Sequence, residues 1–348
     1  MRTWERYLPE IVAAATLLVA TAISLVLFSR YGTYTTAFSV VWGIATLSSV
    51  SLFFAVRRSG EDWHRKLRIL FLIGLVLGFV SIFTGIGGNG TDEPYAIWGY
   101  LSELLHGQDP YTTLLTIHYT AHVLWFWSAP VTSSTYYTYL PLLLFFQVPA
   151  GGDPPTQAIG YELLALACWA GMVYVVRKDP FASLALASPV VALIAANGFD
   201  DLLVLFFMTL SLRGWTTGTK SKVVEYLTYG MKQFANVFWF VYYLLKRRWV
   251  SAGLVIVVTL AFALPFLLWN PLGIGCQALV FSTLPQCASQ PSSARQVSDL
   301  YSHWNYYLWI LWAYVLFHDW IHTHWNRWIA GRHRSIRVPS SVPTEPER

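Results

Sequence analysis

Apolar residues recur in long runs along this chain, and polar residues are largely confined to short segments between them. The longest runs cover residues 11–28, 34–56, 69–87, 157–176 and 250–269. Each is close to the roughly 20 apolar residues that a membrane-spanning helix needs. The other runs cover 114–129, 136–148, 181–197, 202–212, 223–231, 234–245 and 303–321. The pattern predicts an all-α polytopic membrane protein with about 10–12 transmembrane or re-entrant helices.

The amino-acid composition excludes two other classes of protein, a soluble globular protein and a disordered chain. Only 12% of the 348 residues are charged and 55% are hydrophobic, whereas about 25% of residues in a soluble domain are charged. A disordered chain would have few aromatic residues, yet this one has 17 Trp, 20 Tyr and 21 Phe. The first apolar run continues without a small-residue cleavage site, which argues against a cleavable signal peptide.

Lys and Arg are clustered, and cytoplasmic loops are where such clusters are expected. Of the 23 basic residues, 20 fall in clusters or near the termini, at 2–6, 57–68, 177–178, 213–222, 246–248 and 327–348. If all of these are cytoplasmic, Arg30, Lys232 and Arg295 remain for the opposite side. Both termini are then expected in the cytoplasm, with the chain as a multi-pass protein of the cell membrane.

This orientation requires two pairs of short helices. Lys222 and Lys246 would both be cytoplasmic, yet only 23 residues separate them. Two short helices that meet near Lys232 keep both basic clusters on the cytoplasmic side. The interval from Lys178 to Arg213 needs the same arrangement, with a turn at 197–201. Irregular backbone at membrane depth is tolerated only inside protein or beside a cavity, so ionisable residues at these turns are candidates for a functional site.

The chain divides into three parts on this interpretation. Residues 1–68 supply two N-terminal transmembrane helices and a basic cytoplasmic loop, 69–325 form the membrane core, and 326–348 form a basic, disordered cytoplasmic tail. Within the core, 88–135 is expected to be an acidic and aromatic outer loop. One or three crossings between 110 and 176 would both bring the chain back to the cytoplasm.

Asp92 and Glu93 follow the third apolar run and precede a segment with helical apolar spacing, 95–106, that suits a helix in the membrane interface. A carboxylate at this boundary can act as a general base toward a hydroxyl. The alternative is that both acids cap the helix at its N-terminus.

Lys232 and Arg295 are the basic residues expected on the outer side near these acids. Either could hold a lipid phosphate, although Lys232 could instead extend its ammonium to the interface and Arg295 could be a solvated loop charge. Asp200 and Asp201 occupy the other turn, as site acids or as helix caps.

The remaining reactive residues favour neither a metal site nor nucleotide chemistry. Cys276 and Cys287 share the last outer loop, where oxidation to a disulfide is possible. Two histidine pairs at i, i+4 spacing provide too few ligands for a metal: His118 with His122, and His318 with His322. The sequence contains no glycine-rich phosphate loop and no dinucleotide fingerprint, and nothing in it indicates nucleic-acid binding.

Six short motifs, taken in order, resemble those of the GT-C glycosyltransferases that use polyprenyl-phosphate sugars, especially the mannosyltransferase branch. They are Thr-Asp-Glu-Pro-Tyr (91–95), Gly-Gln-Asp-Pro-Tyr (107–111), Tyr-Thr-Tyr-Leu-Pro-Leu (137–142), Asn-Gly-Phe-Asp-Asp (197–201), Tyr-Gly-Met-Lys (229–232) and Leu-Pro-Phe-Leu-Leu-Trp-Asn-Pro (264–271). The resemblance covers about residues 71–271.

The resemblance implies a GT-C-like helical bundle and an inverting transfer of a hexose, with mannose favoured. The donor would be a polyprenyl- or dolichyl-phosphate sugar in the membrane lipid, and the acceptor a hydroxyl of a glycan, glycolipid or protein at the outer face. Asp92 or Glu93 would be the base, and Lys232 with Arg295 would bind the lipid phosphate. Residues expected to line the site are Tyr95, Asp109, Tyr111, Tyr137, Tyr139, Asp200 and Asp201. No metal or other cofactor is required.

Two other functions remain open at this point. A transporter or flippase for a lipid-linked or small polar solute would also use paired short helices, although the hydropathy pattern shows no inverted repeat. An inactive scaffold with the same fold is the second alternative, since Leu140 stands where the family motif has its first Pro.

Overall fold

The computed structural model describes the chain in ten segments: 63–84, 93–123, 127–135, 137, 139–146, 154–196, 198, 200–214, 219–279 and 303–335. The two N-terminal apolar runs, Asp92, Cys287 and Arg295 lie outside them, and the predictions made for these residues are not examined by the structure. Everything below refers to the described segments.

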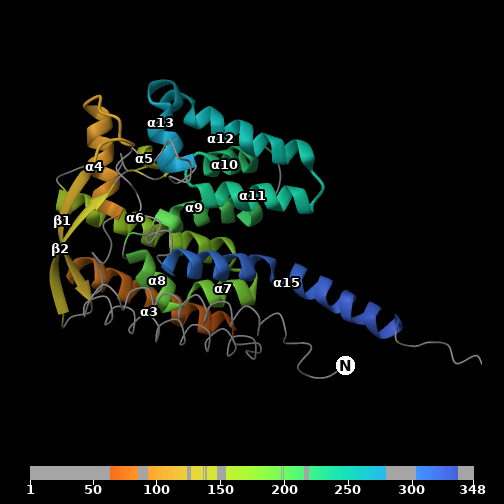
Figure 1. Cartoon of the computed structure of the whole chain (residues 1–348). Coiled ribbons are helices and arrows are strands. Elements are labelled where there is room, and N and C mark those ends of the chain that lie inside the picture. The colour runs from red at the N-terminus through yellow and green to blue at the C-terminus, as the bar shows by residue number, and fades with distance from the viewer. Residues whose placement is uncertain are drawn as a thin grey trace, which may run out of the picture.

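The described residues are mostly helical (Figure 1). The first half contains α3 (Trp63–Thr84), α4 (Glu93–Leu105), β1 (Leu115–Val123), β2 (Trp127–Thr135), α5 (Leu142–Phe145), α6 (Pro154–Val175), α7 (Pro180–Leu186) and α8 (Pro189–Ala196). The second half contains α9 (Asp200–Thr209), η4 (Leu210–Gly214), α10 (Thr219–Tyr229), α11 (Gln233–Leu245), α12 (Trp249–Trp269), α13 (Pro271–Ile274), η5 (Gly275–Leu279) and α15 (His303–Ser335).

The longer helices lie roughly side by side in a bundle (Figure 1). α3 packs on α8 and α6, α6 packs on α9, α11 packs on α12, and α15 packs on α7 and α9. The bundle core contains large aromatic residues such as Trp169, Trp239 and Trp312. The indole of Trp169 donates a 2.7 Å hydrogen bond to the carbonyl of Leu186, so this buried polar atom has a partner.

A two-stranded antiparallel sheet corrects the all-α prediction for 114–129. β1 and β2 pair from Leu115 opposite Thr135 to Val123 opposite Trp127. The segment Leu-Thr-Ile-His-Tyr-Thr-Ala-His-Val alternates in character and is rich in β-branched and aromatic residues, which favours a strand over a helix. His118 is therefore on a strand, where its Nδ1 lies 3.0 Å from the Thr132 hydroxyl.

The hairpin also bears on the number of crossings between 110 and 176. Among the elements described in this interval, α6 alone has the length of a long helix, with 22 residues. α5 has four residues, and the strands lie together as one hairpin. α6 is therefore the one long helix among the described elements of this interval, and its apolar part, Ile159–Val175, belongs to the shorter apolar helices.

The C-terminal helix extends further than expected. The sequence predicts a disordered tail from 326, but α15 continues to Ser335. The segment after Trp325 contains no proline before Pro339, and its apolar and basic residues are compatible with helix. The prediction of disorder is therefore wrong for residues 326–335.

The predicted pair of short helices around Lys232 is present as α10 and α11, whereas the interval from Lys178 to Arg213 contains three helices, because its first arm is broken into α7 and α8. α8 and α9 meet at a turn where Gly198 has φ +72°, a conformation that glycine adopts without steric cost. α10 and α11 meet at Gly230, Met231 and Lys232, and the amide of Leu142 donates a 2.9 Å hydrogen bond to the carbonyl of Gly230. The two pairs bring polar turns close to one end of the bundle.

The turns rich in Lys and Arg lie at the other end, called here the basic end (Figure 1). Two contacts show that adjacent elements meet there: Ser211 and Ser221 donate to each other's carbonyl oxygens at 3.2 and 3.0 Å, and the Lys222 ammonium lies 2.7 Å from the Tyr243 hydroxyl. The basic end is formed by residues 65–68, 177–178, 213, 220–222 and 246–248.

Two described helices are long and apolar enough to cross a membrane, Trp63–Phe83 and Trp249–Trp269. Ile159–Val175 and Gln233–Leu245 are shorter apolar helices. The exposed side chains of α12 include Val250, Leu260 and Leu268. An apolar surface of this kind on a helix is what lipid contact requires, and it gives limited support to the membrane prediction.

Gly74 permits the close approach of α3 to α6 and α8. A Cβ at this position would come within 2.8 Å of the Trp169 ring and 3.1 Å of the Ala192 Cβ. We expect Gly74→Val to destabilise the protein by about 1–3 kcal/mol, because the rigid neighbours must move apart. Thermal unfolding in detergent measures the effect.

Gly253→Val is the matched control. Gly253 also lies within a long apolar helix, α12, but a Cβ there would meet no atom within 4 Å. Equal loss of stability in the two variants would contradict the close packing of α3.

Candidate functional site: a buried ion cluster at the motif end

Lys232 is the centre of a buried ion cluster. Its Nζ lies 2.7 Å from Oδ1 of Asp200 and 2.8 Å from Oδ1 of Asp201. The side chain of Lys232 is 2% exposed, and both carboxylates are fully buried. Charge-assisted hydrogen bonds of this length are strong, and removal of one partner would leave a buried charge without compensation.

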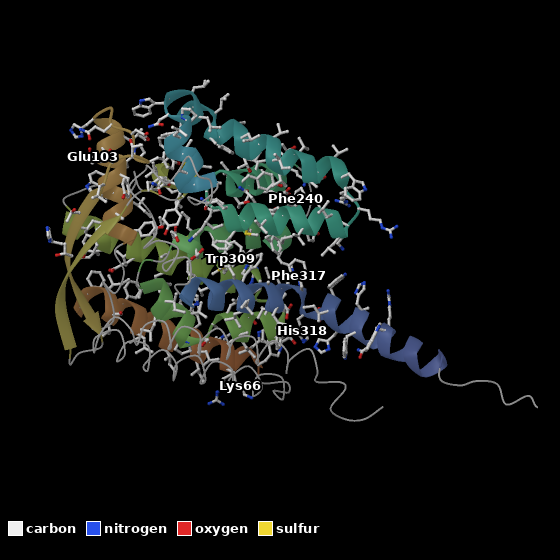
Figure 2. All side chains as sticks on the ribbon, viewed as in Figure 1. Lys66, Glu103, Phe240, Trp309, Phe317 and His318 are labelled. Carbon is white, nitrogen blue, oxygen red and sulfur yellow. The ribbon has the colours of Figure 1, made fainter. Side chains whose placement is uncertain are left out.

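Two aromatic residues complete the cluster from other parts of the chain. The indole of Trp309, near the start of α15, donates a 2.8 Å hydrogen bond to Oδ1 of Asp201. Figure 2 shows Trp309 within the bundle, while His318 lies further along the same helix. The Lys232 ammonium also lies 4.8 Å from the ring centroid of Tyr139, a distance at which a cation is attracted by the ring face.

Local structure explains why these groups meet. Asp200 and Asp201 form the first turn of α9, where the helix dipole stabilises carboxylates. Lys232 precedes α11 in an extended conformation, with φ −148° and ψ 139°. Both helix starts belong to the short helix pairs, so the two turns meet and one ammonium faces two carboxylates.

A second polar cluster joins the segment after α4 to the end of α12. Oδ1 of Asp109 accepts the amide of Tyr111 at 3.0 Å, and Oδ2 accepts the side-chain amide of Asn270 at 2.9 Å. Oδ2 also accepts the Thr112 hydroxyl at 3.1 Å. Asn270 in turn caps α13, because its Oδ1 accepts the amide of Gly273 at 3.0 Å. Asp109 therefore acts as a structural tether between two motifs.

Tyrosine rings fill the space between these two clusters. The hydroxyl of Tyr111 donates to the carbonyl of Tyr139, and that of Tyr137 donates to the carbonyl of Leu140, both at 2.9 Å. Burial raises the pKa of both phenols well above the ordinary value; Asp109 adds to the rise at Tyr111, and Tyr111 and Asp200 add to it at Tyr137. Both hydroxyls therefore remain donors.

Helix α4 starts beside this aromatic layer. Its first residue is Glu93, directly after Asp92. Tyr100 on α4 contacts Tyr137 with ring centroids 5.4 Å apart. Burial raises the pKa of Tyr95, and the carboxylate of Glu162 on α6 adds to the rise. Helix α4 thus lies against α6 near its start, at Tyr95, and against the tyrosine layer further along, at Tyr100.

These contacts define the motif end, the end of the bundle opposite the basic end. Among the described residues, it contains 93–111, 137, 139–142, 198, 200–201, 230–233 and 264–274. The structure brings together most site residues predicted from the sequence: Tyr95, Asp109, Tyr111, Tyr137, Tyr139, Asp200, Asp201 and Lys232. Glu93 is placed by its backbone, and Asp92 and Arg295 lie outside the described residues.

The structure places the Lys232 ammonium in the interior, so the alternative in which it extends to the interface is wrong. The sequence suggested an ammonium available to a lipid phosphate, or one extended to the interface. In the structure, burial and two carboxylates already satisfy this ammonium. Lys232 thus joins the α8–α9 turn to the α10–α11 turn, and Asp200 and Asp201, expected as site acids or as helix caps, are its ion partners in the first turn of α9.

Sequence reasoning overlooked Glu162 and Trp309, and it included Asn270 only as part of the motif 264–271, without a role. Glu162 is fully buried in α6, and it is a lone carboxylate within the apolar run 157–176. Such a residue in a membrane helix is a functional candidate by default, so the signal was available. Nothing in the sequence indicated that Trp309 would contact Asp201, which lies 108 positions earlier.

The described residues contain no group of three or more His, Cys, Asp and Glu side chains placed to hold a metal. Cys276 is disulfide-bonded and Cys168 is a buried free thiol. The expectation of a disulfide at Cys276 is therefore confirmed.

No known protein family, curated protein or solved structure matches the chain.

The ion cluster predicts a large effect of Lys232→Met. This change leaves two buried carboxylates without their cation, so we expect a loss of about 3–5 kcal/mol in stability. Replacing Asp200 and Asp201 by Asn in the same protein should recover part of the loss, because the Asn side chains are neutral. Unfolding temperature and the monodisperse fraction in detergent measure both effects.

Lys246→Met is the matched control, since Lys246 ends the same helix, α11, and is exposed. It should change stability by no more than about 0.5 kcal/mol. If Lys232→Met were equally mild, the buried ion cluster would not hold the helix pairs together.

Proposed function

We propose that this chain is a membrane glycosyltransferase that transfers a hexose, with mannose favoured, from a polyprenyl-phosphate sugar to an acceptor hydroxyl. The reaction takes place at the motif end, which faces the outer side of a cell membrane. The proposal rests on the GT-C resemblance of the sequence motifs together with their arrangement in the structure.

The observation that carries the proposal is the meeting of these motifs at one end of the bundle. Asp109 and Asn270, 161 positions apart, share a hydrogen bond. The hydroxyl of Tyr111 donates a hydrogen bond to the carbonyl of Tyr139, and Lys232 forms an ion pair with Asp200. Motifs that served unrelated structural purposes would have no reason to gather at one end of the bundle. The two candidate bases follow each other at the start of α4, a helix that packs on this tyrosine layer through Tyr100.

In the proposed reaction, Asp92 or Glu93 removes the proton from the acceptor hydroxyl as its oxygen attacks the anomeric carbon of the donor. The bond from this carbon to the phosphate oxygen breaks on the opposite face, so the anomeric configuration inverts. The lipid phosphate leaves as an anion that needs no proton. A base in this position typically contributes about 10²–10⁴-fold to the rate.

Helix lengths are compatible with a membrane orientation in which the basic end is cytoplasmic. α11 has 13 residues and therefore rises about 20 Å, which is less than the ~30 Å hydrocarbon core. α12 has 21 residues and rises about 31 Å. The Lys232 turn would then lie within the outer leaflet, enclosed by protein, as buried ionic groups at that depth must be.

A transporter or flippase is the second candidate function. It is favoured by one observation, the meeting of two short helix pairs at buried ionic residues, which is a common construction of transport sites. The two functions differ in their product, because a flippase moves the intact lipid-linked sugar whereas the transferase releases polyprenyl phosphate.

We expect purified protein to release polyprenyl phosphate from a polyprenyl-phosphate mannose donor when an acceptor glycan is present. Asp92→Asn combined with Glu93→Gln should lower this rate by at least about 100-fold, because the base is removed. Chromatographic quantification of the released polyprenyl phosphate measures the rate, and the unfolding temperature shows whether the variant remains folded.

Glu103→Gln serves as the control, since it removes a carboxylate from the same helix, α4, at a position away from the proposed base. It should retain most of the activity. Full activity in the double variant would disprove the assignment of the base, and movement of intact donor across proteoliposomes without release would favour the flippase.

A further inference from the structure

The turn between α11 and α12 carries three consecutive basic residues, Lys246, Arg247 and Arg248. All three are exposed. In the part of the chain that the structure describes, no ion pair involves any of them. The sequence from 226 to 297 contains no Asp or Glu, so no acidic residue close in sequence balances these charges. The turn is therefore a concentrated positive charge.

Arg247 has an unusual backbone conformation for its residue type. Its φ is 56°, the left-handed region that glycine commonly occupies just after the end of a helix. An arginine there has a steric cost that glycine would avoid. A strained residue that persists is an indication that its side chain has a role, and this observation is independent of the charge itself.

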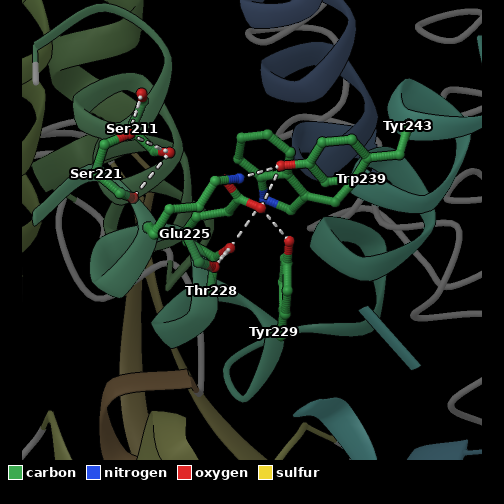
Figure 3. Close-up of polar contacts among 8 residues, drawn as sticks. Ser211, Ser221, Glu225, Thr228, Tyr229, Trp239 and Tyr243 are labelled. Atoms are coloured by element: carbon green, nitrogen blue, oxygen red, sulfur yellow. Dashed lines mark hydrogen bonds and ion pairs between the residues drawn. The ribbon is translucent and has the colours of Figure 1, made fainter. Parts of the chain in front are cut away.

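Lys222 adds a fourth cation beside this turn. A buried carboxylate, Glu225, accepts hydrogen bonds from the hydroxyls of Tyr229 and Tyr243 (Figure 3). The ammonium of Lys222 lies 2.8 Å from Oε2 of Glu225 and 2.7 Å from the Tyr243 hydroxyl. These contacts hold Lys222 near the end of α11. The side chain remains 46% exposed, and an ammonium has three donors, so it can still bind an anion.

Large apolar residues are exposed directly beside the cations. Val223 follows Lys222, Leu245 precedes Lys246, and Trp249, which follows Arg248, is 69% exposed. Val250 is 81% exposed. A soluble anion would use the cations alone. A surface that offers cations beside exposed aliphatic and indole side chains matches a molecule with an anionic head and apolar chains, the pattern seen where proteins bind acidic lipids.

From these observations we infer that Lys222 and the Lys246–Arg248 turn form a binding surface for the headgroup of an anionic phospholipid at the basic end, with Leu245, Trp249 and Val250 in contact with its acyl chains. This surface is separate from the motif end and does not depend on the proposed transfer reaction. The basic side chains bind the phosphate of the headgroup. The acyl chains lie against the exposed apolar side chains at the end of α11 and the start of α12.

The test uses the full-length protein in detergent, titrated with phosphatidylglycerol or with phosphatidylcholine and observed by native mass spectrometry. Phosphatidylglycerol should bind more tightly. Each basic residue at an anionic surface contributes roughly fivefold to affinity, so Lys246→Gln, Arg247→Gln and Arg248→Gln together should weaken phosphatidylglycerol binding by about 100-fold. Equal affinity for the two lipids would overturn the inference.

Removing the same number of charges at the start of α3, by Arg65→Gln, Lys66→Gln and Arg68→Gln, provides the matched control. These residues also lie at the basic end but at the start of a different helix, so this variant should lose less than about fivefold. A loss as large as that of the turn variant would show that only the overall charge matters, and would contradict a specific surface.

Arg247→Gly separates binding from stability. Glycine relieves the left-handed strain, so the unfolding temperature should stay the same or rise, while phosphatidylglycerol binding falls by about fivefold. Unchanged binding would remove Arg247 from the surface. Glycerol phosphate should compete only weakly, because it lacks acyl chains; competition as strong as that of the lipid would show a site for soluble anions instead.

Discussion

The ion cluster of Lys232 with Asp200 and Asp201 is the interaction on which the arrangement of this bundle depends. It joins the turn between α8 and α9 to the turn between α10 and α11, and Trp309 brings the start of α15 to the same place. A buried cation with two carboxylates is stable only if its partners are held in position. The cluster therefore fixes the position of the α8–α9 turn relative to the α10–α11 turn. It also fixes the position of the start of α15.

The layer of tyrosines lies next to this cluster, because Tyr139 contacts Lys232, and it packs on α4 through Tyr100. The Asp109–Asn270 bond lies beside Tyr111, after the C-terminal end of α4. The structure thus assigns different tasks to residues that the sequence presented as one group. Lys232, Asp200, Asp201 and Asp109 maintain the geometry of the motif end. The chemical step of the proposed reaction is left to the acidic pair at the start of α4.

Basic side chains differ in burial and ion pairing between the two ends of the bundle. At the motif end, the ammonium of Lys232 is enclosed and paired. At the basic end, Lys246, Arg247 and Arg248 are exposed and take part in no described ion pair. A membrane with anionic lipids on its cytoplasmic side would supply the missing negative charge, so the unpaired cations and the positive-inside interpretation support each other.

Charge spacing predicted the pair of short helices around Lys232, because 23 residues between Lys222 and Lys246 are too few for two full crossings. It did not predict that Lys232 would be paired, since a contact between positions 32 apart depends on how the two helix pairs pack. The β1–β2 hairpin was missed because its apolar residues resemble a short membrane helix when only hydrophobicity is counted. Glu225 was missed although Lys222 and Tyr229 lie at helical spacings of three and four from it.

The most direct test of this account is the sidedness of the α10–α11 hairpin. Single cysteines at Lys220 and Arg248, in a protein whose own cysteines are replaced by Ser or Ala, can be labelled with a membrane-impermeant maleimide in intact cells and in inverted vesicles. The account predicts that both positions react only from the cytoplasmic side, and that a cysteine at Gln108 reacts only from outside. Labelling of Lys220 and Arg248 from opposite sides would show that α10 and α11 do not turn back at Lys232, and would contradict the account.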